Sequence, residues 1–181
     1  MNAAADVVLA AAWAAVVVPG LRLATPRGRT LRLVLLVCLG LGVWLLTVLR
    51  GGRAPHDPVL ETVGLLVCGS GVVLHWRARR ALGPAFATQP VVPTSGLLAT
   101  HGPYAIVRHP MYAAVLLVAL GTLLVCRSAA TVCLLLGLAI GLAWKARRED
   151  AILAAGLGPA WEEYAARVPA LIPQLRRAAP P

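Results

Sequence analysis

Long apolar segments, each close to the length of a membrane-spanning helix, restrict most strongly what this chain can fold into. A helix needs about 20 apolar residues to cross a bilayer core, within a range of about 17 to 25. Three such segments are Ala3–Leu21, Leu31–Leu49 and Val59–Trp76. Only 13% of the 181 residues are charged, which is about half of what soluble domains carry. The sequence therefore predicts an all-α integral membrane bundle that forms a single domain.

A fourth apolar stretch, Met111–Trp144, is too long for one membrane crossing. Arg127 is its only charged residue. As a single helix it would be about 50 Å long, whereas the bilayer core is ~30 Å thick. We therefore expect a helical hairpin that turns near Arg127–Ser128, which brings the prediction to about five transmembrane helices. The first three lie within residues 1–76, and the hairpin lies within residues 77–181.

The segment after the hairpin reads KARREDAILAAGLGPAWEEYAARVPALIPQ and mixes charged with apolar residues. Its helical spacing continues to Leu157, where Gly156 and Gly158 are expected to end the helix. Pro159 suits the first turn of another short helix, which should end before Pro169. We expect this second helix to be amphipathic and to lie over the cytoplasmic face of the membrane. Its aromatic residues are Trp161 and Tyr164.

Basic residues give the expected orientation in the cell membrane. With five helices and a cytoplasmic C-terminus, only three of the 17 Lys and Arg residues fall outside, namely Arg50, Arg53 and Arg127. This bias agrees with the positive-inside rule and places the N-terminus outside. Both polar-rich segments, 77–109 and 145–181, then lie on the cytoplasmic side, where they can meet.

The basic residues and the cysteines also favour some partners over others. The basic residues lie in connectors between apolar segments, which favours anionic lipid headgroups over nucleic acid. The cysteines show neither a CxxC pair nor a zinc spacing, so we expect buried thiols and no metal. They are Cys38, Cys68, Cys126 and Cys133.

The sequence HGPYAIVRHPMY, residues 101–112, directly precedes the hairpin and is called the His-Pro segment below. Pro110 is expected to start a helix that His109 caps, with free backbone N–H groups at Met111 and Tyr112. With Tyr104 nearby, this segment suits a zwitterionic ligand that carries a carboxylate, an adenine ring and a cation. A belt of interfacial tyrosines is the simpler alternative for the segment. For Arg108 alone, a side chain that snorkels to the headgroups is the favoured interpretation.

A second polar cluster lies at the cytoplasmic end of the hairpin, in the sequence KARRED, residues 145–150. Lys145 and Glu149 are four residues apart and therefore share a helix face. A surface ladder of salt bridges would give the same pattern. Because the predicted topology places this cluster beside the His-Pro segment, we expect the two to form one site.

The two segments together resemble the isoprenylcysteine carboxyl methyltransferase family, which is related in architecture to the phospholipid methyltransferases. GPYAIVRHPMY and the later EDAILAAGLGPAWEEYAARVP carry the resemblance, which covers about Gln89–Pro173. The family consists of integral membrane enzymes that use S-adenosylmethionine. The resemblance implies methyl transfer to a carboxylate, or to another nucleophile, of a lipidic or small hydrophobic acceptor at the cytoplasmic face. Residues 77–181 would then be the cofactor-binding half.

The resemblance also implies roles for individual residues. Lys145 and Glu149 would belong to the catalytic group. We add Arg148 to this group, because it could help Lys145 to hold an anionic acceptor. The chain departs from the family pattern at Gly96, where a histidine is frequent, and at Lys145, where an arginine orients the acceptor carboxylate. The implied cofactor-binding residues are Gln89, Gly96, Leu97, Leu98, Ala99, Tyr104, His109, Pro110, Met111, Tyr112 and Glu149.

Two other functions remain open at this point. The departures at Gly96 and Lys145 are compatible with a catalytically degenerate lipid-binding or assembly subunit of the same fold. A small transporter is a further alternative, although transporters usually place ionisable groups near the middle of the membrane. This chain gathers its polar residues on one side, which favours the methyltransferase hypothesis.

Overall fold

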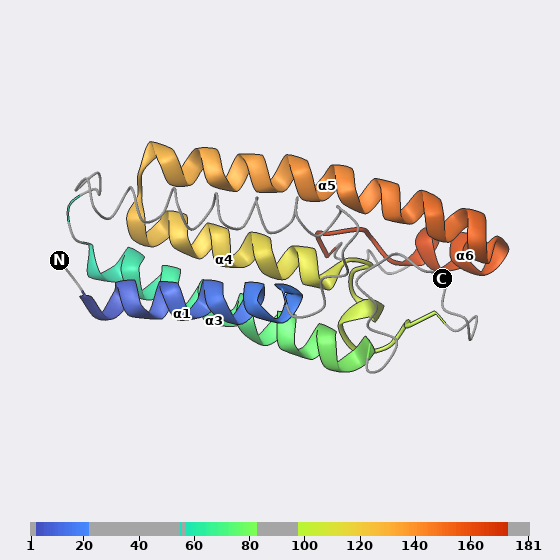
Figure 1. Cartoon of the computed structure of the whole chain (residues 1–181), viewed down its shortest axis with the longest axis horizontal. Helices are drawn as coiled ribbons and strands as arrows, with labels where there is room; N and C mark the ends of the chain where they lie inside the picture. The colour runs from blue at the N-terminus through green and yellow to red at the C-terminus, as the bar shows by residue number, and fades with distance from the viewer. Residues whose placement is uncertain (1–2, 22–54, 56, 83–97, 174–181) are drawn as a thin grey trace, which may run out of the picture.

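The computed structural model of the chain describes residues 3–21, 55, 57–82 and 98–173. Every regular element in these residues is helical (Figure 1), so the all-α prediction is confirmed for this part of the chain. The expected helix at 31–49 and Cys38 lie outside the described residues. The elements are α1 (Ala3–Leu21), α3 (Pro58–Leu82), the 3-10 turn η2 (Gly102–Ala105), α4 (Pro110–Cys126), α5 (Ala129–Leu157) and α6 (Pro159–Arg167).

Two of these helices, α3 and α5, are long and apolar enough to cross a membrane. Only 22% of the most apolar stretch of α3 and 28% of that of α5 are buried inside the chain. Such surfaces suit lipid contact, because the core helix of a soluble protein would be mostly covered. The helices α1 and α4 match two further expected spans, and the total of five stays a prediction.

The predicted hairpin is confirmed, and its turn falls at the expected residues. Arg127 adopts the left-handed conformation with φ 45° and ends α4, and its N–H donates to the carbonyl of Leu123 at 2.7 Å. Ser128 then caps α5, because its hydroxyl accepts from the N–H of Thr131 in a capping box. The turn between α4 and α5 thus consists of two adjacent residues, Arg127 and Ser128.

The antiparallel helices α3 and α4 pack against each other through glycines. A methyl group added to Gly121 would lie 2.5 Å from both the sulfur of Cys68 and the carbonyl oxygen of Gly64. One added to Gly71 would lie 2.9 Å from the carbonyl oxygen of Ala114. Small residues let helix backbones approach closely, as is common between membrane helices. This contact fixes the position of α4, and with it the His-Pro segment at its start.

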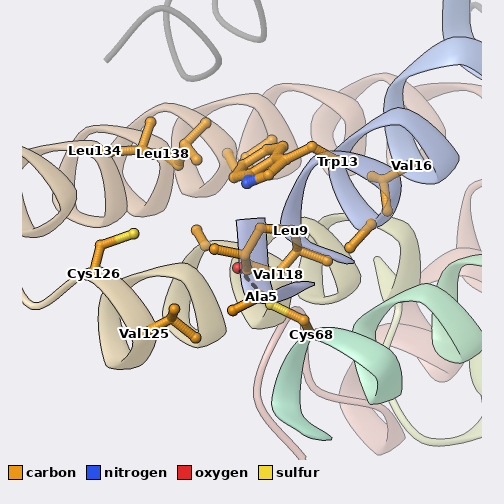
Figure 2. Packing of buried hydrophobic residues seen from close by; sticks show 13 residues of the cluster. Ala5, Leu9, Trp13, Val16, Cys68, Val118, Val125, Cys126, Leu134 and Leu138 are labelled. Atoms are coloured by element: carbon orange, nitrogen blue, oxygen red, sulfur yellow. Dashed lines mark hydrogen bonds between the residues drawn. The ribbon is translucent and has the colours of Figure 1, made fainter. Parts of the chain in front are cut away.

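Helix α1 packs against α3 and α4 with the side of the helix that carries Leu9 and Trp13 (Figure 2). Both side chains are almost fully buried. The indole N–H of Trp13 donates to the hydroxyl of Thr122 at 3.0 Å, and that hydroxyl donates onward to the carbonyl of Val118. The polar atoms of Trp13 and Thr122 inside this apolar core are therefore satisfied.

Three sequence-based expectations need correction. The third helix reaches Leu82 and not Trp76, so the basic residues that follow Trp76 are helical. Cys133 is exposed, whereas Cys68 and Cys126 are buried as expected. The helix α5 includes Gly156, and only Gly158 lies at its end.

The expected amphipathic helix is present as α6, but its apolar face meets the protein itself. Trp161 and Tyr164 are 4% exposed and pack with Val168 against Leu153 and Leu157. The helix therefore folds back on the end of α5 instead of laying these aromatic rings on the membrane. In Figure 1, α6 lies at the same end of the molecule as the end of α3 and the start of α4.

Candidate active site

The site is built on the residues that start α4. Pro110 occupies the first turn and His109 is the N-cap, as the sequence predicts. The preceding backbone pairs with the segment after α6, because the N–H of Arg108 donates to the carbonyl of Pro169 at 2.8 Å. The N–H of His109 likewise donates to the carbonyl of Ala170 at 2.9 Å. These two bonds hold the His-Pro segment against the C-terminal part of the described chain.

One expectation about the start of α4 is wrong. The N–H of Tyr112 is not free, because it donates to the carbonyl of His109 at 3.0 Å. A tightened first turn satisfies this donor within the chain. The chemistry of the site therefore depends on side chains more than on this part of the backbone.

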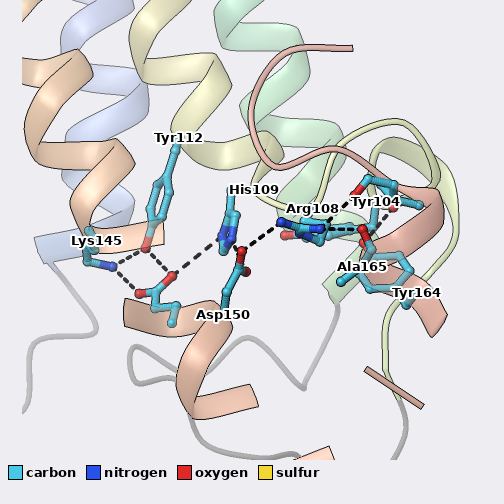
Figure 3. Close-up of polar contacts among 10 residues, drawn as sticks. Tyr104, Arg108, His109, Tyr112, Lys145, Asp150, Tyr164 and Ala165 are labelled. Carbon is cyan, nitrogen blue, oxygen red and sulfur yellow. Dashed lines mark hydrogen bonds and ion pairs between the residues drawn. The ribbon is translucent and has the colours of Figure 1, made fainter. Parts of the chain in front are cut away.

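Tyr112 meets Glu149, in the C-terminal half of α5, at the centre of the site (Figure 3). The phenol of Tyr112 donates to Oε2 of Glu149 at 2.6 Å. The ammonium of Lys145 donates to both the Tyr112 phenol oxygen and Oε1 of Glu149, and it lies 4.6 Å from the centroid of the Tyr112 ring. A phenol, a carboxylate and an ammonium group thus share one small volume.

A second carboxylate continues this network through His109. Nε2 of His109 lies 2.7 Å from Oδ1 of Asp150, and since a carboxylate only accepts, the imidazole donates there. Nδ1 of His109 then faces Oε2 of Glu149 at 3.7 Å. The imidazole also stacks on the Tyr112 ring with a centroid distance of 5.3 Å and an interplanar angle of 3°. These contacts fix the orientation of the His109 ring.

Arg108 ties this network to α6. Its guanidinium donates to Oδ2 of Asp150 at 2.9 Å and to the carbonyls of Ala165 and Val168 at 2.7 and 3.0 Å. It also lies 5.9 Å from the centroid of the Trp161 ring. Its side chain is 15% exposed, so Arg108 points into the protein and does not snorkel to the headgroups. A cation at the C-terminal end of a helix is favoured by the exposed carbonyls there.

The two tyrosines beside this network are held in the neutral form. The hydroxyl of Tyr164 donates to the carbonyl oxygen of Tyr104 at 2.7 Å. Burial raises the pKa of Tyr164 to about 12, although the positive charge of Arg108 acts to lower it; the carboxylate of Asp150 acts with burial. Burial, followed by the neighbouring Tyr164 and Glu149, raises the pKa of Tyr104 well above its ordinary value. Both phenols can therefore act as hydrogen-bond donors at neutral pH.

The structure places the sequence-predicted residues in three groups. The residues brought together are Tyr104, His109, Pro110, Met111, Tyr112, Lys145 and Glu149. Leu98 packs on the aromatic face of α6, and the neighbouring Ala99 is half-buried. Arg148 stays apart, because it is exposed and its guanidinium lies 5.0 Å from the ring of Trp144. The residues outside the described part are Gln89, Gly96 and Leu97.

Sequence reasoning missed Asp150, the inward role of Arg108, and Tyr164. The signal for the first two was present in the sequence. Arg108 and His109 are adjacent basic residues, and Glu149 and Asp150 are adjacent acidic residues. Once Glu149 is placed near the His-Pro segment, the following carboxylate becomes the natural partner of the residues beside His109. Nothing in the sequence indicates the bond from Tyr164 to a backbone carbonyl.

The fold and the site define a class: a helical membrane protein whose polar cluster lies at one end of its bundle. The family model of the phospholipid methyltransferases matches residues 60–159, which is more than half of the chain. The chain therefore belongs to the phospholipid methyltransferase family, which is related to the isoprenylcysteine carboxyl methyltransferases. It is a methyltransferase of a membrane-embedded family whose members generally use S-adenosylmethionine. No curated protein matches the chain.

Proposed function

We propose that this protein transfers a methyl group from S-adenosylmethionine to a lipidic or small hydrophobic acceptor at the cytoplasmic face of the membrane. The contact between Tyr112 and Glu149 is the observation that carries the proposal. It joins the His-Pro segment to the first residue of EDAILAAGLGPAWEEYAARVP, and these are the two segments that resemble the family motifs. The His-Pro segment and Glu149 fall within the family match at 60–159, and the second motif begins inside it.

The donor set of the site fits the proposed cofactor. Glu149 offers a carboxylate and Tyr112 an aromatic face, and such a pair attracts a sulfonium or an amino group. The ammonium of Lys145 already lies against both groups, so the geometry accommodates a cation. His109 and Tyr104 complete a polar, largely buried wall beside it. We assign Gln89, Gly96, Leu97, Leu98, Ala99, Pro110 and Met111 to the same cofactor site.

When bound, S-adenosylmethionine supplies a methyl group that its sulfonium already activates, so the protein contributes alignment and a dry pocket. In the proposal, Tyr112 and Glu149 hold the cation, while Asp150 fixes the imidazole of His109. A carboxylate acceptor is itself a nucleophile and needs no base. With a thiol or amine acceptor, Glu149 or His109 would take the proton.

Lys145 is the residue proposed to hold an anionic acceptor, because its side chain is the most open in the cluster. It is 39% exposed, against 17% for Glu149 and 8% for His109. Arg148 lies one turn beyond Trp144 on an exposed face of α5 and can assist only from outside the cluster. An acceptor lipid would therefore enter from the side of α5, with its tail along the exposed apolar face of that helix.

A lipid-binding or assembly subunit that lacks turnover is the second candidate. The engagement of Lys145 with Tyr112 and Glu149 favours it, because a residue held there cannot at the same time hold an acceptor. The two candidates differ in turnover and not in cofactor binding.

The experiment is incubation of the purified protein with methyl-labelled S-adenosylmethionine and lipid extract, followed by mass analysis of the labelled lipids. We expect label in at least one lipid with the wild type and a loss of more than tenfold with Glu149→Gln, since a charged hydrogen bond is lost. The matched control is Glu163→Gln, because Glu163 is 72% exposed on α6. Cofactor binding without any labelled product would contradict the enzymatic proposal and favour the second candidate.

A further inference from the structure

The ammonium of Lys145 lies in a cage formed by two groups. Tyr112 presents its ring face 4.6 Å away and its phenol oxygen as an acceptor, and Glu149 presents one carboxylate oxygen. An aromatic face combined with a carboxylate is the arrangement that proteins use to bind organic cations. The ammonium of Lys145 thus occupies a site that could also bind a cation from a ligand.

Charge decides what else can bind in this cage. With Lys145 in place, its single positive charge balances the single negative charge of Glu149, so the cage has little preference for a further cation. Without it, the carboxylate and the ring face would favour a positively charged group. Two cations within a few ångströms repel each other strongly in a partly buried site.

The side chain of Lys145 can adopt a second position outside the cage. Its side chain is 39% exposed, and its flexible four-carbon stem lets the ammonium turn outward to solvent or to headgroups. Asp150 and Arg108 do not depend on it, because their contacts run through His109 and α6. The cage walls can therefore persist when the ammonium leaves.

We propose that Lys145 sets the preference of the site between the sulfonium cofactor and its neutral thioether product by occupying the cation position in the cage between Tyr112 and Glu149. This inference rests on the proposed function, because it assumes that the cofactor's sulfonium enters this cage. Binding of S-adenosylmethionine displaces the ammonium outward, toward the side where an anionic acceptor would bind. After methyl transfer the product sulfur is neutral, so Lys145 returns to the cage and favours release of S-adenosylhomocysteine.

The test compares the Kd values of S-adenosylmethionine and S-adenosylhomocysteine for the full-length protein in detergent, measured by calorimetry. In Lys145→Met the ratio of the product Kd to the cofactor Kd should rise about tenfold over the wild type, as expected for an uncovered cation site. Lys145→Arg keeps the charge and should leave the ratio within about twofold of the wild type. Arg147→Met removes a charge from an exposed neighbouring position and should also leave the ratio unchanged.

Several outcomes would overturn the inference. A ratio in Lys145→Met that equals or falls below the wild-type ratio would show that Lys145 does not compete with the sulfonium. An equal rise in Arg147→Met would assign the effect to net charge alone. If neither ligand binds the wild type or any variant, the proposed function itself fails, which distinguishes that failure from failure of this inference.

Discussion

Asp150 holds two neighbouring residues, Arg108 and His109, against α5. One oxygen accepts from His109 at 2.7 Å and the other from Arg108 at 2.9 Å, and Arg108 in turn binds the end of α6. The carboxylate therefore acts on the site through His109, as a positioning residue. The side chain of Asp150 is only 21% exposed, so water can replace the hydrogen bonds of these two partners only in part.

We predict that Asp150→Asn lowers the free energy of unfolding by about 2 kcal/mol, because hydrogen bonds to a charged group are weakened on both sides. Thermal denaturation in detergent measures this change. The control is Glu163→Gln, which breaks an exposed pair with Arg167 at 3.3 Å and should cost well under ~1 kcal/mol. Equal losses in the two variants would show that the Asp150 network does not hold the site together.

The tyrosines give a prediction about high pH. The pKa of Tyr164 is raised from 10.0 to about 12, so folding favours its neutral phenol. The stability that this phenol contributes should be fully present below pH about 10 and should be lost as the pH rises toward about 12. Alkaline titration of tyrosinate absorbance, compared between the wild type and Tyr164→Phe, measures this. A phenolate that titrates near 10 in the folded protein and disappears in Tyr164→Phe would contradict the buried donor.

At the scale of helices, the close contact of α3 with α4 places the His-Pro segment. Gly121 has the least space of the glycines in the described helices, because backbone atoms of Gly64 and Cys68 lie next to it. These atoms cannot move aside as the end of a flexible side chain could. The register of α4 on α3 should therefore depend on this residue.

We predict that Gly121→Ala destabilises the protein by about 1–3 kcal/mol, as overpacking does elsewhere. Gly137→Ala is the matched control, since a methyl group there meets nothing within 4 Å. It should be neutral or slightly stabilising, because alanine favours a helix more than glycine does. Thermal unfolding in detergent compares the two. A tolerant Gly121 would show that α3 and α4 pack less closely than described.

Local chemistry explains which elements the sequence could predict. Pro110 and Ser128 start helices through the geometry of their own residues, so both boundaries were predicted correctly. The end of α3 was not predicted correctly, because Arg77 and the basic residues after it resemble a connector between helices. Arginine is nevertheless a good helix former, so the helix continues through them. The apolar face of α6 was predicted, but the surface that it meets depends on how α5 ends.

The pairing of Arg108 with Asp150 could not be read from the sequence either. These residues are separated by 42 positions, and their contact depends on the register of α4, α5 and α6 together. The meeting of Tyr112 with Glu149 was expected only because both segments were assigned to one membrane side and resemble linked motifs. Long-range register is the part of the site that periodicity does not encode.

At the scale of the whole molecule, the polar cluster lies at one end of the bundle and the α4–α5 turn at the other (Figure 1). We predict that the cluster end faces the cytoplasm, because basic residues are retained there. In a variant without native cysteines, Arg167→Cys in intact cells should resist a membrane-impermeant maleimide, and Pro55→Cys should react. The opposite labelling would invert the topology and remove the cytoplasmic site.

The central claim is that Tyr112 and Glu149 jointly hold a sulfonium cofactor at this end of the bundle. Equilibrium binding of radiolabelled S-adenosylmethionine to the purified protein in detergent tests it most directly. We predict saturable binding by the wild type and by Glu163→Gln, and affinity at least tenfold weaker in both Tyr112→Ala and Glu149→Ala, which remove the ring face and the carboxylate. Absence of saturable binding by the wild type, or unchanged affinity in both site variants, would contradict it.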